Sequence, residues 1–177
     1  MMYCATCDAP LFKGMKVAVI GGGNSGFEAA VQLQQIAEHV TILEIQDSVN
    51  ADEILQDKIQ KADNTEIMTN ATIKEFKGEK MLKSIIVENT ETGETSERDA
   101  GGVFVEIGSV PNVDFLNGML EMNEIQEIKV ACDCTTNVDG LFAAGDCTTV
   151  PEKQIIVAAG QGAIAALGAY RYLIRKQ

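Results

Sequence analysis

The stretch that decides the fold is Lys16-Val-Ala-Val-Ile20, followed directly by Gly21-Gly-Gly-Asn-Ser-Gly26. The first of these runs is apolar and predicts a buried strand, and apolar residues then recur at helical spacing over residues 25–38. A second apolar run, residues 40–43, ends at Glu44. A strand, a glycine turn, a helix and a second strand within about 30 residues predict a right-handed βαβ unit.

The glycine turn matches the G-x-G-x-x-G pattern in the context that this pattern needs, since it follows a strand and opens a helix. Gly21 permits a tight turn, Gly23 lets the backbone approach a pyrophosphate, and Gly26 allows the helix and strand to pack closely. A glycine-rich turn without a ligand is the weaker alternative. The predicted dinucleotide site comprises Gly21, Gly22, Gly23, Asn24, Ser25 and Gly26.

Glu44, at the end of the second strand, decides which dinucleotide is expected. Its carboxylate can accept hydrogen bonds from a ribose 2′-hydroxyl but would repel a 2′-phosphate. The next three residues, Ile45-Gln-Asp47, contain no Lys or Arg that could receive that phosphate. The sequence therefore predicts NADH in preference to NADPH.

A Cys-x-x-Cys pair, Cys4-Ala-Thr-Cys7, precedes the βαβ unit and is followed by Asp8. This spacing suits a reversible disulfide at a turn or helix start, where a thiolate is stabilised, and it also suits half of a zinc site. The dinucleotide unit that follows favours the redox interpretation, with Asp8 moving a proton to or from a thiolate. No metal site is expected, because the spacing Cys132-x-Cys134 is tighter than zinc motifs use and His39 has no companion ligand in the sequence.

The rest of the chain predicts a β-meander and then a less regular segment. A helix over residues 50–61 would open with a capping box formed by Asn50 and Glu53. Short strands are expected at residues 66–76, 82–89 and 94–98, and a buried strand at 103–107 would return to the sheet and reach Gly108. Pro111 marks the expected domain boundary, which divides the chain into residues 1–110 and 111–177. The second part predicts a hairpin at residues 125–130, a strand at 141–144 and a long helix from about Gln154.

Composition excludes several classes of function. The net charge of −12 argues against nucleic acid or an anionic membrane as a partner. The charge-free run at residues 154–170 is rich in Gly, Ala and Gln, so a packed helix is expected there and not a membrane span. Five cysteines, an odd count, and the lack of a signal peptide favour the cytoplasm.

Several of these motifs together resemble the low-molecular-weight thioredoxin reductase family, which belongs to the class II pyridine nucleotide-disulfide oxidoreductases. The likeness is strongest to its branch represented by the F subunit of alkyl hydroperoxide reductase. The resemblance implies an α/β fold with a Rossmann-like, three-layer NAD(P)-binding domain carrying a β-meander, plus the C-terminal half of an FAD-binding domain. The matching segments are residues 3–8, 12–14, 17–26, 142–149 and 153–155.

The resemblance also implies roles for individual residues. Cys4 and Cys7 would form the redox disulfide, with Cys7 facing the flavin, Cys4 attacking the disulfide of a peroxiredoxin or thioredoxin-like partner, and Asp8 as acid–base residue. Residues 136–146 match a second FAD-binding segment, and residues 153–155 would approach the isoalloxazine edge. Gly160-Gln-Gly-Ala-Ile-Ala165 is interpreted as close helix packing. The implied cofactor-binding residues outside the glycine turn and Glu44 are Gly108, Thr136, Asn137, Gly145, Asp146, Lys153, Gln154 and Ile155.

The sequence departs from the family in carrying one glycine fingerprint where members have two, and in having no tandem thioredoxin-fold module. It therefore resembles the C-terminal part of a longer enzyme, and FAD binding is expected to need the missing half. Apolar surface left uncovered on residues 111–177 would favour a homodimer or another association. An NADH-binding module without flavin or turnover remains the alternative.

Overall fold

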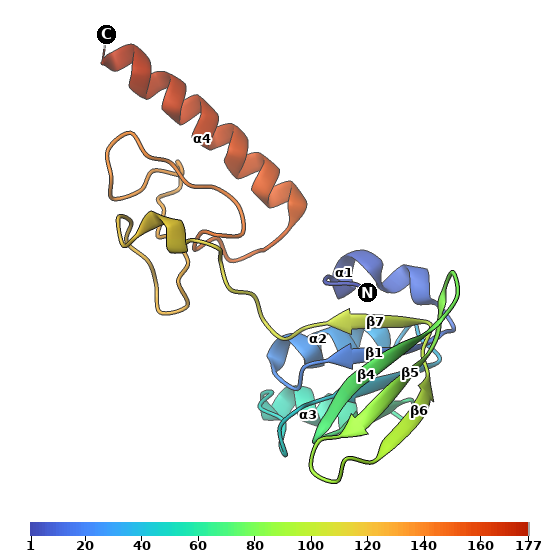
Figure 1. Cartoon of the computed structure of the whole chain (residues 1–177). Coiled ribbons are helices and arrows are strands. Elements are labelled where there is room, and N and C mark those ends of the chain that lie inside the picture. Colours follow the sequence, from blue (N-terminus) through green and yellow to red (C-terminus); the bar gives the residue numbers. More distant parts are fainter. Residues whose placement is uncertain (177) are drawn as a thin grey trace. The chain divides into compact units, whose positions relative to one another are not determined.

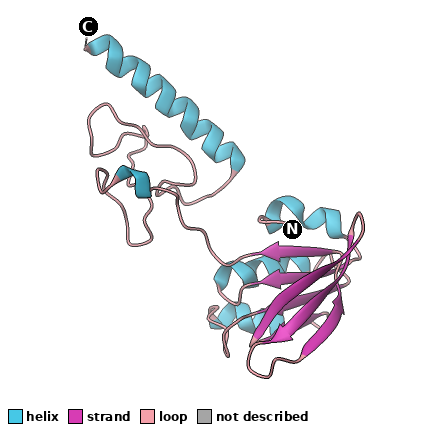
Figure 2. Ribbon diagram, viewed as in Figure 1, coloured by secondary structure: helices cyan, strands magenta, loops and turns pink. Residues whose placement is uncertain are grey.

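The computed structural model describes residues 1–176 and divides after Gly108 into two compact units, residues 1–108 and 109–176. Figure 1 follows the chain through both units, and Figure 2 shows that all the strands belong to the first one.

The first unit is built on a parallel sheet of four strands in the order β3-β2-β1-β7. Val17 and Val19 of β1 point toward the helices, whereas Ala18 between them points to the opposite face, as the two-residue period of a strand requires. Both faces are therefore covered, which explains the nearly continuous apolar runs. The strands are β1 (Lys16–Ile20), β2 (His39–Leu43), β3 (Thr65–Met68) and β7 (Gly102–Val105).

Helices cover one face of this sheet and an antiparallel meander covers the other (Figure 1). The helical side holds α1 (Ala5–Asp8), the 3₁₀ turn η1 (Ala9–Phe12), α2 (Asn24–Leu33) and α3 (Glu53–Gln60). The meander has the strand order β4-β5-β6, formed by β4 (Ala71–Gly78), β5 (Leu82–Asn89) and β6 (Thr95–Asp99). The predicted α/β class, with three layers and a β-meander, is confirmed.

Two of the elements expected in the first unit differ clearly from the observed ones. The strand expected at residues 66–76 is two strands, β3 in the parallel sheet and β4 in the meander, because Asn70 between them adopts a left-handed backbone with φ of 50°. The helix expected to reach residue 38 ends at Leu33, and the chain continues through turns in which the Ile36 and Ala37 N–H groups both bond the Leu33 carbonyl.

The capping box predicted for Asn50 and Glu53 is wrong. The N-cap of α3 is Asp52, which makes no side-chain capping bond. The Asn50 N–H instead donates to the Gly22 carbonyl at 2.9 Å. This segment is therefore held by the glycine turn.

The second unit contains the 3₁₀ turn η2 (Asp114–Leu116) and the long helix α4 (Ile155–Arg175), which begins after Gln154 as expected. The hairpin and strand predicted here are wrong, since residues 109–176 form only isolated bridges, among them Met122–Ile128 and Thr135–Phe142. A small apolar core centres on Val113, Leu120 and Ile128. None of the helices formed by residues 1–176 combines the length and apolar character that a membrane crossing requires.

Candidate dinucleotide pocket and redox disulfide

The glycine turn joins β1 to α2 and depends on two close backbone approaches. Gly21 has a φ of 123°, and a Cβ there would overlap the Glu106 carbonyl. A Cβ on Gly26 would overlap the carbonyl oxygen of Gly21 itself, so α2 can lie this close to the turn only with glycine at this position. The packing roles expected of Gly21 and Gly26 are confirmed.

A cavity of about 410 Å³ opens beside this turn, at the carboxyl ends of β1, β2 and β7. A Cβ on Gly23 would meet no atom within 4 Å, so the backbone here faces open space. The N-terminus of α2 lies at this cavity, and its free N–H groups favour an anion. The cavity is lined by Gly21, Gly22, Gly23, Asn24, Ser25, Glu44, Ile45, Glu106, Ile107 and Gly108.

Glu44 and Asn24 are both held by backbone groups. Glu44 Oε2 accepts the Gly22 N–H at 2.6 Å, and Oε1 accepts the Gln46 N–H at 2.8 Å. Each carboxylate oxygen keeps a second lone pair for a ligand hydroxyl. Asn24 Oδ1 accepts the Asp52 N–H at 2.8 Å, which ties the glycine turn to the start of α3.

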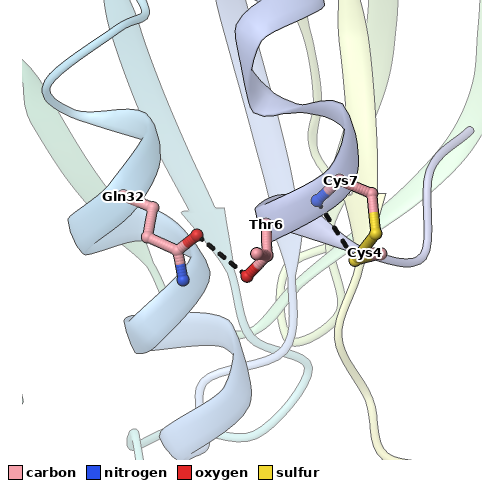
Figure 3. Close-up of a disulfide and its surroundings, with 4 residues drawn as sticks. All are labelled: Cys4, Thr6, Cys7 and Gln32. Carbon is pink, nitrogen blue, oxygen red and sulfur yellow. Dashed lines mark hydrogen bonds between the residues drawn. A yellow bond between two sulfur atoms is a disulfide. The ribbon is translucent and has the colours of Figure 1, made fainter. Parts of the chain in front are cut away.

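The redox pair lies at the start of α1, and the structure contains the Cys4–Cys7 disulfide (Figure 3). The Cys7 N–H donates to Cys4 Sγ at 3.2 Å, so Cys4 caps the short helix, while Thr6 Oγ1 donates to Gln32 Oε1 of α2 at 3.2 Å. Cys7 is exposed and Cys4 is half-buried. A disulfide at a helix start, as the sequence predicts, is therefore confirmed, and Asp8 ends the same helix.

Glu106 is a residue of this region that the sequence analysis missed. It follows β7, as Glu44 follows β2, and it lines the same cavity. Burial raises the pKa of its carboxyl, whereas a hydrogen bond from the Ala5 N–H acts in the opposite direction. An acidic residue at the carboxyl end of a predicted parallel strand is the signal that could have identified it.

The residues expected to contact FAD lie in the second unit, and most of them already have partners there. Thr136 Oγ1 donates to the Leu141 carbonyl at 2.9 Å, and Asn137 Oδ1 accepts the Glu121 N–H at 2.9 Å. Asp146 is exposed and follows the buried Gly145.

Gln161 of α4 fastens this turn and was not singled out as a site residue by the sequence. Its Oε1 accepts the Gly145 N–H at 2.7 Å, and fully buried Thr148 donates its hydroxyl to the Gly145 carbonyl at 2.7 Å. The close packing expected at Gly160 and Gly162 is wrong, because a Cβ at either would meet open space.

Lys153 forms an ion pair that the sequence did not indicate. Its Nζ lies 2.7 Å from Glu127 Oε1 and donates to the Thr148 carbonyl at 2.5 Å. Glu127 also accepts a bond from Asn123 Nδ2 at 2.7 Å. These contacts hold the loop that leads to Gln154, the N-cap of α4.

Glu127→Gln tests how much this ion pair stabilises the second unit. The hydrogen bond from Lys153 lowers the pKa of Glu127, so its stabilisation is present above the ordinary value of 4.5 and is lost as the pH falls through the lower, folded-state pKa. We expect the variant to have a lower Tm than the wild type at neutral pH and the same Tm in acid. Thermal unfolding over a pH series measures this, with exposed Glu152→Gln as the control. Equal Tm values at every pH would contradict the assignment.

The predicted site residues thus form two sets. Cys4, Cys7, Asp8, the glycine turn, Glu44 and Gly108 belong to the first unit, and the predicted residues from Thr136 to the exposed Ile155 belong to the second. Within residues 1–176, no group of three His, Cys, Asp or Glu side chains is placed to hold a metal ion. The cysteines outside the disulfide are Cys132, Cys134 and Cys147.

Comparison with known proteins agrees with this arrangement. Over 98% of its length, the chain is 50% identical to the F subunit of alkyl hydroperoxide reductase of Escherichia coli (strain K12) and, again over 98%, 50% identical to an NADH dehydrogenase of Bacillus subtilis (strain 168). It covers 33% and 34% of those proteins, so it spans about a third of their length. Among solved structures, thioredoxin reductase from Streptococcus pyogenes MGAS5005 superimposes with a TM-score of 0.90 at 33% identity, over 98% of this chain and 57% of that one.

The family model for pyridine nucleotide-disulphide oxidoreductases matches residues 1–162. That match includes the redox disulfide, the glycine turn with its cavity, and the Gly145–Asp146 turn. The chain belongs to the pyridine nucleotide-disulphide oxidoreductase family.

Proposed function

We propose that this chain is the NADH-binding and redox-disulfide portion of a flavin-linked disulfide reductase. The observation that carries the proposal is that one compact unit holds both the cavity at the glycine turn and the Cys4–Cys7 disulfide. Family membership supports oxidoreductase chemistry, and the names of the relatives support either a peroxiredoxin system or thioredoxin as the destination of the electrons.

In the first unit, the glycine turn and the α2 N-terminus bind the pyrophosphate of NADH, and Glu44 accepts a ribose hydroxyl. Gly108 bounds the same cavity. Asn24 keeps the turn fixed on α3 through its bond with the Asp52 N–H. A binding site held this way is rigid before the ligand arrives, which lowers the entropy lost on binding.

The residues of the second unit fit FAD. Asp146 is an exposed carboxylate beside a buried turn, and Ile155 and Ile156 are 88% and 79% exposed, so the first turn of α4 is accessible. Asp146, Gly145, Thr136 and Asn137 would hold the ribityl and pyrophosphate region, with Lys153, Gln154 and Ile155 at the flavin edge. FAD bound there supplies the two-electron chemistry that links a nicotinamide to a disulfide. The positive end of the α4 dipole favours an anion at this position.

NADH and one proton convert the Cys4–Cys7 disulfide into two thiols and release NAD⁺. The dithiol then reduces the disulfide of a peroxiredoxin or thioredoxin-like protein, with Cys4 attacking a partner sulfur and Cys7 closing the disulfide again. Asp8 moves the proton to or from the departing thiolate.

NADH and NADPH binding to the purified chain tests the proposal. Titration of intrinsic nicotinamide fluorescence should give a saturable signal for NADH and weaker binding for NADPH. No saturable NADH signal, or tighter binding of NADPH, would contradict it.

Glu44→Gln should narrow the difference between the two nucleotides. The neutral amide loses the charge-assisted bond to the ribose hydroxyl and also the repulsion of a 2′-phosphate, so the preference for NADH should fall about tenfold. The measurement is the ratio of the two dissociation constants. Gln46→Ala, which leaves the carboxylate in place, is the control and should keep the wild-type ratio.

A second candidate is an NADH-binding module without flavin or turnover. It is favoured by the cavity at the glycine turn, whose lining residues all belong to the first unit. The visible spectrum of the chain with added FAD separates the two. Co-elution of flavin absorbance with the chain supports the reductase portion, and NADH binding without retained flavin supports the module.

We propose that the chain associates with itself as a homodimer through the apolar face of α4. We also propose the cytoplasm as its location, which the odd number of cysteines favours. Ile156, Leu167, Tyr170 and Leu173 are each at least 58% exposed. Exposed apolar surface of this kind favours association. Sedimentation velocity should give a dimer for the wild type and a monomer for Leu167→Glu. A wild-type monomer at all concentrations would contradict this.

A further inference from the structure

Glu106 lies between the two features that define the first unit. Its backbone N–H donates to the Ile20 carbonyl at 2.8 Å, which extends the pairing of β1 with β7 by one residue. The segment that leads into Cys4 pairs in parallel with β7, since the Val105 N–H donates to the Met2 carbonyl at 2.9 Å. The Ala5 N–H, which follows Cys4 in the redox motif, is close enough to the Glu106 carboxyl to lower its pKa. Glu106 also lines the cavity at the glycine turn. One side chain therefore contacts the redox motif and borders the proposed nucleotide site.

The cavity beside Glu106 is lined by acidic residues and by no basic ones. Among the residues that line the cavity, the ionisable ones are Glu44 and Glu106, and no Lys or Arg is present to offset them. On α1 and its N-cap the ionisable residues are Cys4, Cys7 and Asp8, while the first turn of α2 carries no acidic residue. Burial already raises the pKa of this carboxyl. A diphosphate brought to the glycine turn would add negative charge to a cavity whose lining residues include no cation.

We propose that Glu106 is a positioning residue that couples occupancy of the cavity to the Cys4–Cys7 pair, an inference that rests on the proposed dinucleotide site. Ionised Glu106 attracts the Ala5 N–H. Its negative charge disfavours thiolates at the cysteines and a diphosphate in the cavity. Nucleotide binding favours the protonated form of Glu106. Protonation in turn removes a negative charge from the neighbourhood of Cys4 and Cys7, which favours their thiolate forms and hence the dithiol. Because linkage is reciprocal, reduction of the disulfide also strengthens nucleotide binding.

The nucleotide side of the coupling has a defined pH dependence. Since binding raises the pKa of Glu106, affinity should be higher when Glu106 is protonated and should fall as the pH rises through that pKa. A rise of one pKa unit on binding corresponds to an overall change of about tenfold in the dissociation constant. Glu106→Gln, which keeps an oxygen acceptor for the Ala5 N–H but cannot ionise, should bind NAD⁺ with little pH dependence and with the affinity of protonated wild type.

The redox side can be measured without flavin. In a buffer of reduced and oxidised dithiothreitol, the reagent's two thiols give their electrons and protons to the Cys4–Cys7 disulfide and become a cyclic disulfide. At a pH between the pKa of Glu106 in the free chain and its higher pKa in the nucleotide complex, saturating NAD⁺ should raise the wild-type ratio of dithiol to disulfide about threefold, since a threefold change requires only about half a pKa unit of coupling. Glu106→Gln should show a raised ratio without nucleotide and no further change with it.

The experiment combines both measurements on the full chain: NAD⁺ titrations from about pH 5 to about pH 8, and dithiol ratios with and without NAD⁺. Glu28→Gln, an exposed position on α2, removes the same charge and should behave as wild type. Wild-type pH dependence or a wild-type nucleotide effect on the dithiol ratio in Glu106→Gln would overturn the coupling. Absence of NAD⁺ binding by the wild type at every pH would overturn the proposed dinucleotide site, and the coupling with it.

Discussion

Gly26→Ala should unfold or severely weaken the first unit and abolish NADH binding. The added Cβ would overlap the Gly21 carbonyl, and neither group can move without shifting α2 away from β1. Overpacking against a fixed backbone costs about 3 kcal/mol, a large share of the stability of a small unit. Denaturant unfolding followed by far-UV circular dichroism measures the loss, and NADH titration of the folded fraction measures binding.

Gly23→Ala is the matched control for this prediction. It adds the same methyl group to the same turn, but at a position where no atom lies within 4 Å. We expect stability within about 1 kcal/mol of wild type, together with a marked loss of NADH affinity, because the methyl group occupies space that the pyrophosphate needs. Wild-type stability in Gly26→Ala, or wild-type affinity in Gly23→Ala, would contradict our account of the turn.

Cys4→Ser and Cys7→Ser should each lower the proposed disulfide reductase activity by about 10³-fold or more, because either change removes the disulfide that would accept the electrons. The two variants should differ in how they react with a partner. Cys7→Ser retains the attacking Cys4 and should accumulate a mixed disulfide with an aromatic disulfide reagent, whereas Cys4→Ser should form much less of it. Mass spectrometry of proteolytic peptides distinguishes adducts at Cys4 and Cys7 from an adduct at the exposed Cys132.

Cys132→Ser is the control for the cysteine variants, since Cys132 is an exposed free thiol of the second unit. Its activity should equal that of the wild type. Activity retained in Cys4→Ser, or lost in Cys132→Ser, would place the redox chemistry on other sulfur atoms. Preferential trapping through Cys7 would reverse the roles proposed for the two cysteines.

The first unit could be predicted in most respects because its local signals agree with its tertiary structure. The run from Lys16 to Ile20 is buried on both faces, and the glycine turn has to be close-packed, so composition and spacing both carry the information. In the first unit, the features that the sequence did not indicate depend on single residues. Asn70 divides one expected strand into β3 and β4 through its backbone conformation, and the glycine turn binds the Asn50 N–H that was expected to take part in a helix cap.

The second unit was harder to predict, because hydrogen bonds to side chains there replace the backbone pairing of regular strands. A hairpin was expected at residues 125–130, yet Asn123 Oδ1 accepts the N–H groups of Ile125 and Glu127 at 3.2 and 2.8 Å, and Gln126 has a φ of 65°. Such local bonds compete with a strand ladder.

The contacts of the candidate site were only partly predictable for a related reason. The glycine turn, Glu44 and the disulfide follow from motifs, which specify residues at fixed spacing. Glu106, Gln161 and the pair Lys153–Glu127 act through contacts between segments distant in sequence. No spacing rule relates those residues, so only the folded structure brings them to notice.

The central claim is that electrons from NADH reach the Cys4–Cys7 disulfide, and a thiol count tests it most directly. The chain has five cysteines, of which Cys132, Cys134 and Cys147 are free in the oxidised state. After anaerobic incubation with FAD and NADH, alkylation in denaturant, which exposes the buried Cys134, should label all five, and Cys4 and Cys7 should be the newly labelled pair. Labelling of only the three free cysteines, by a chain that dithiothreitol reduces fully, would contradict the claim.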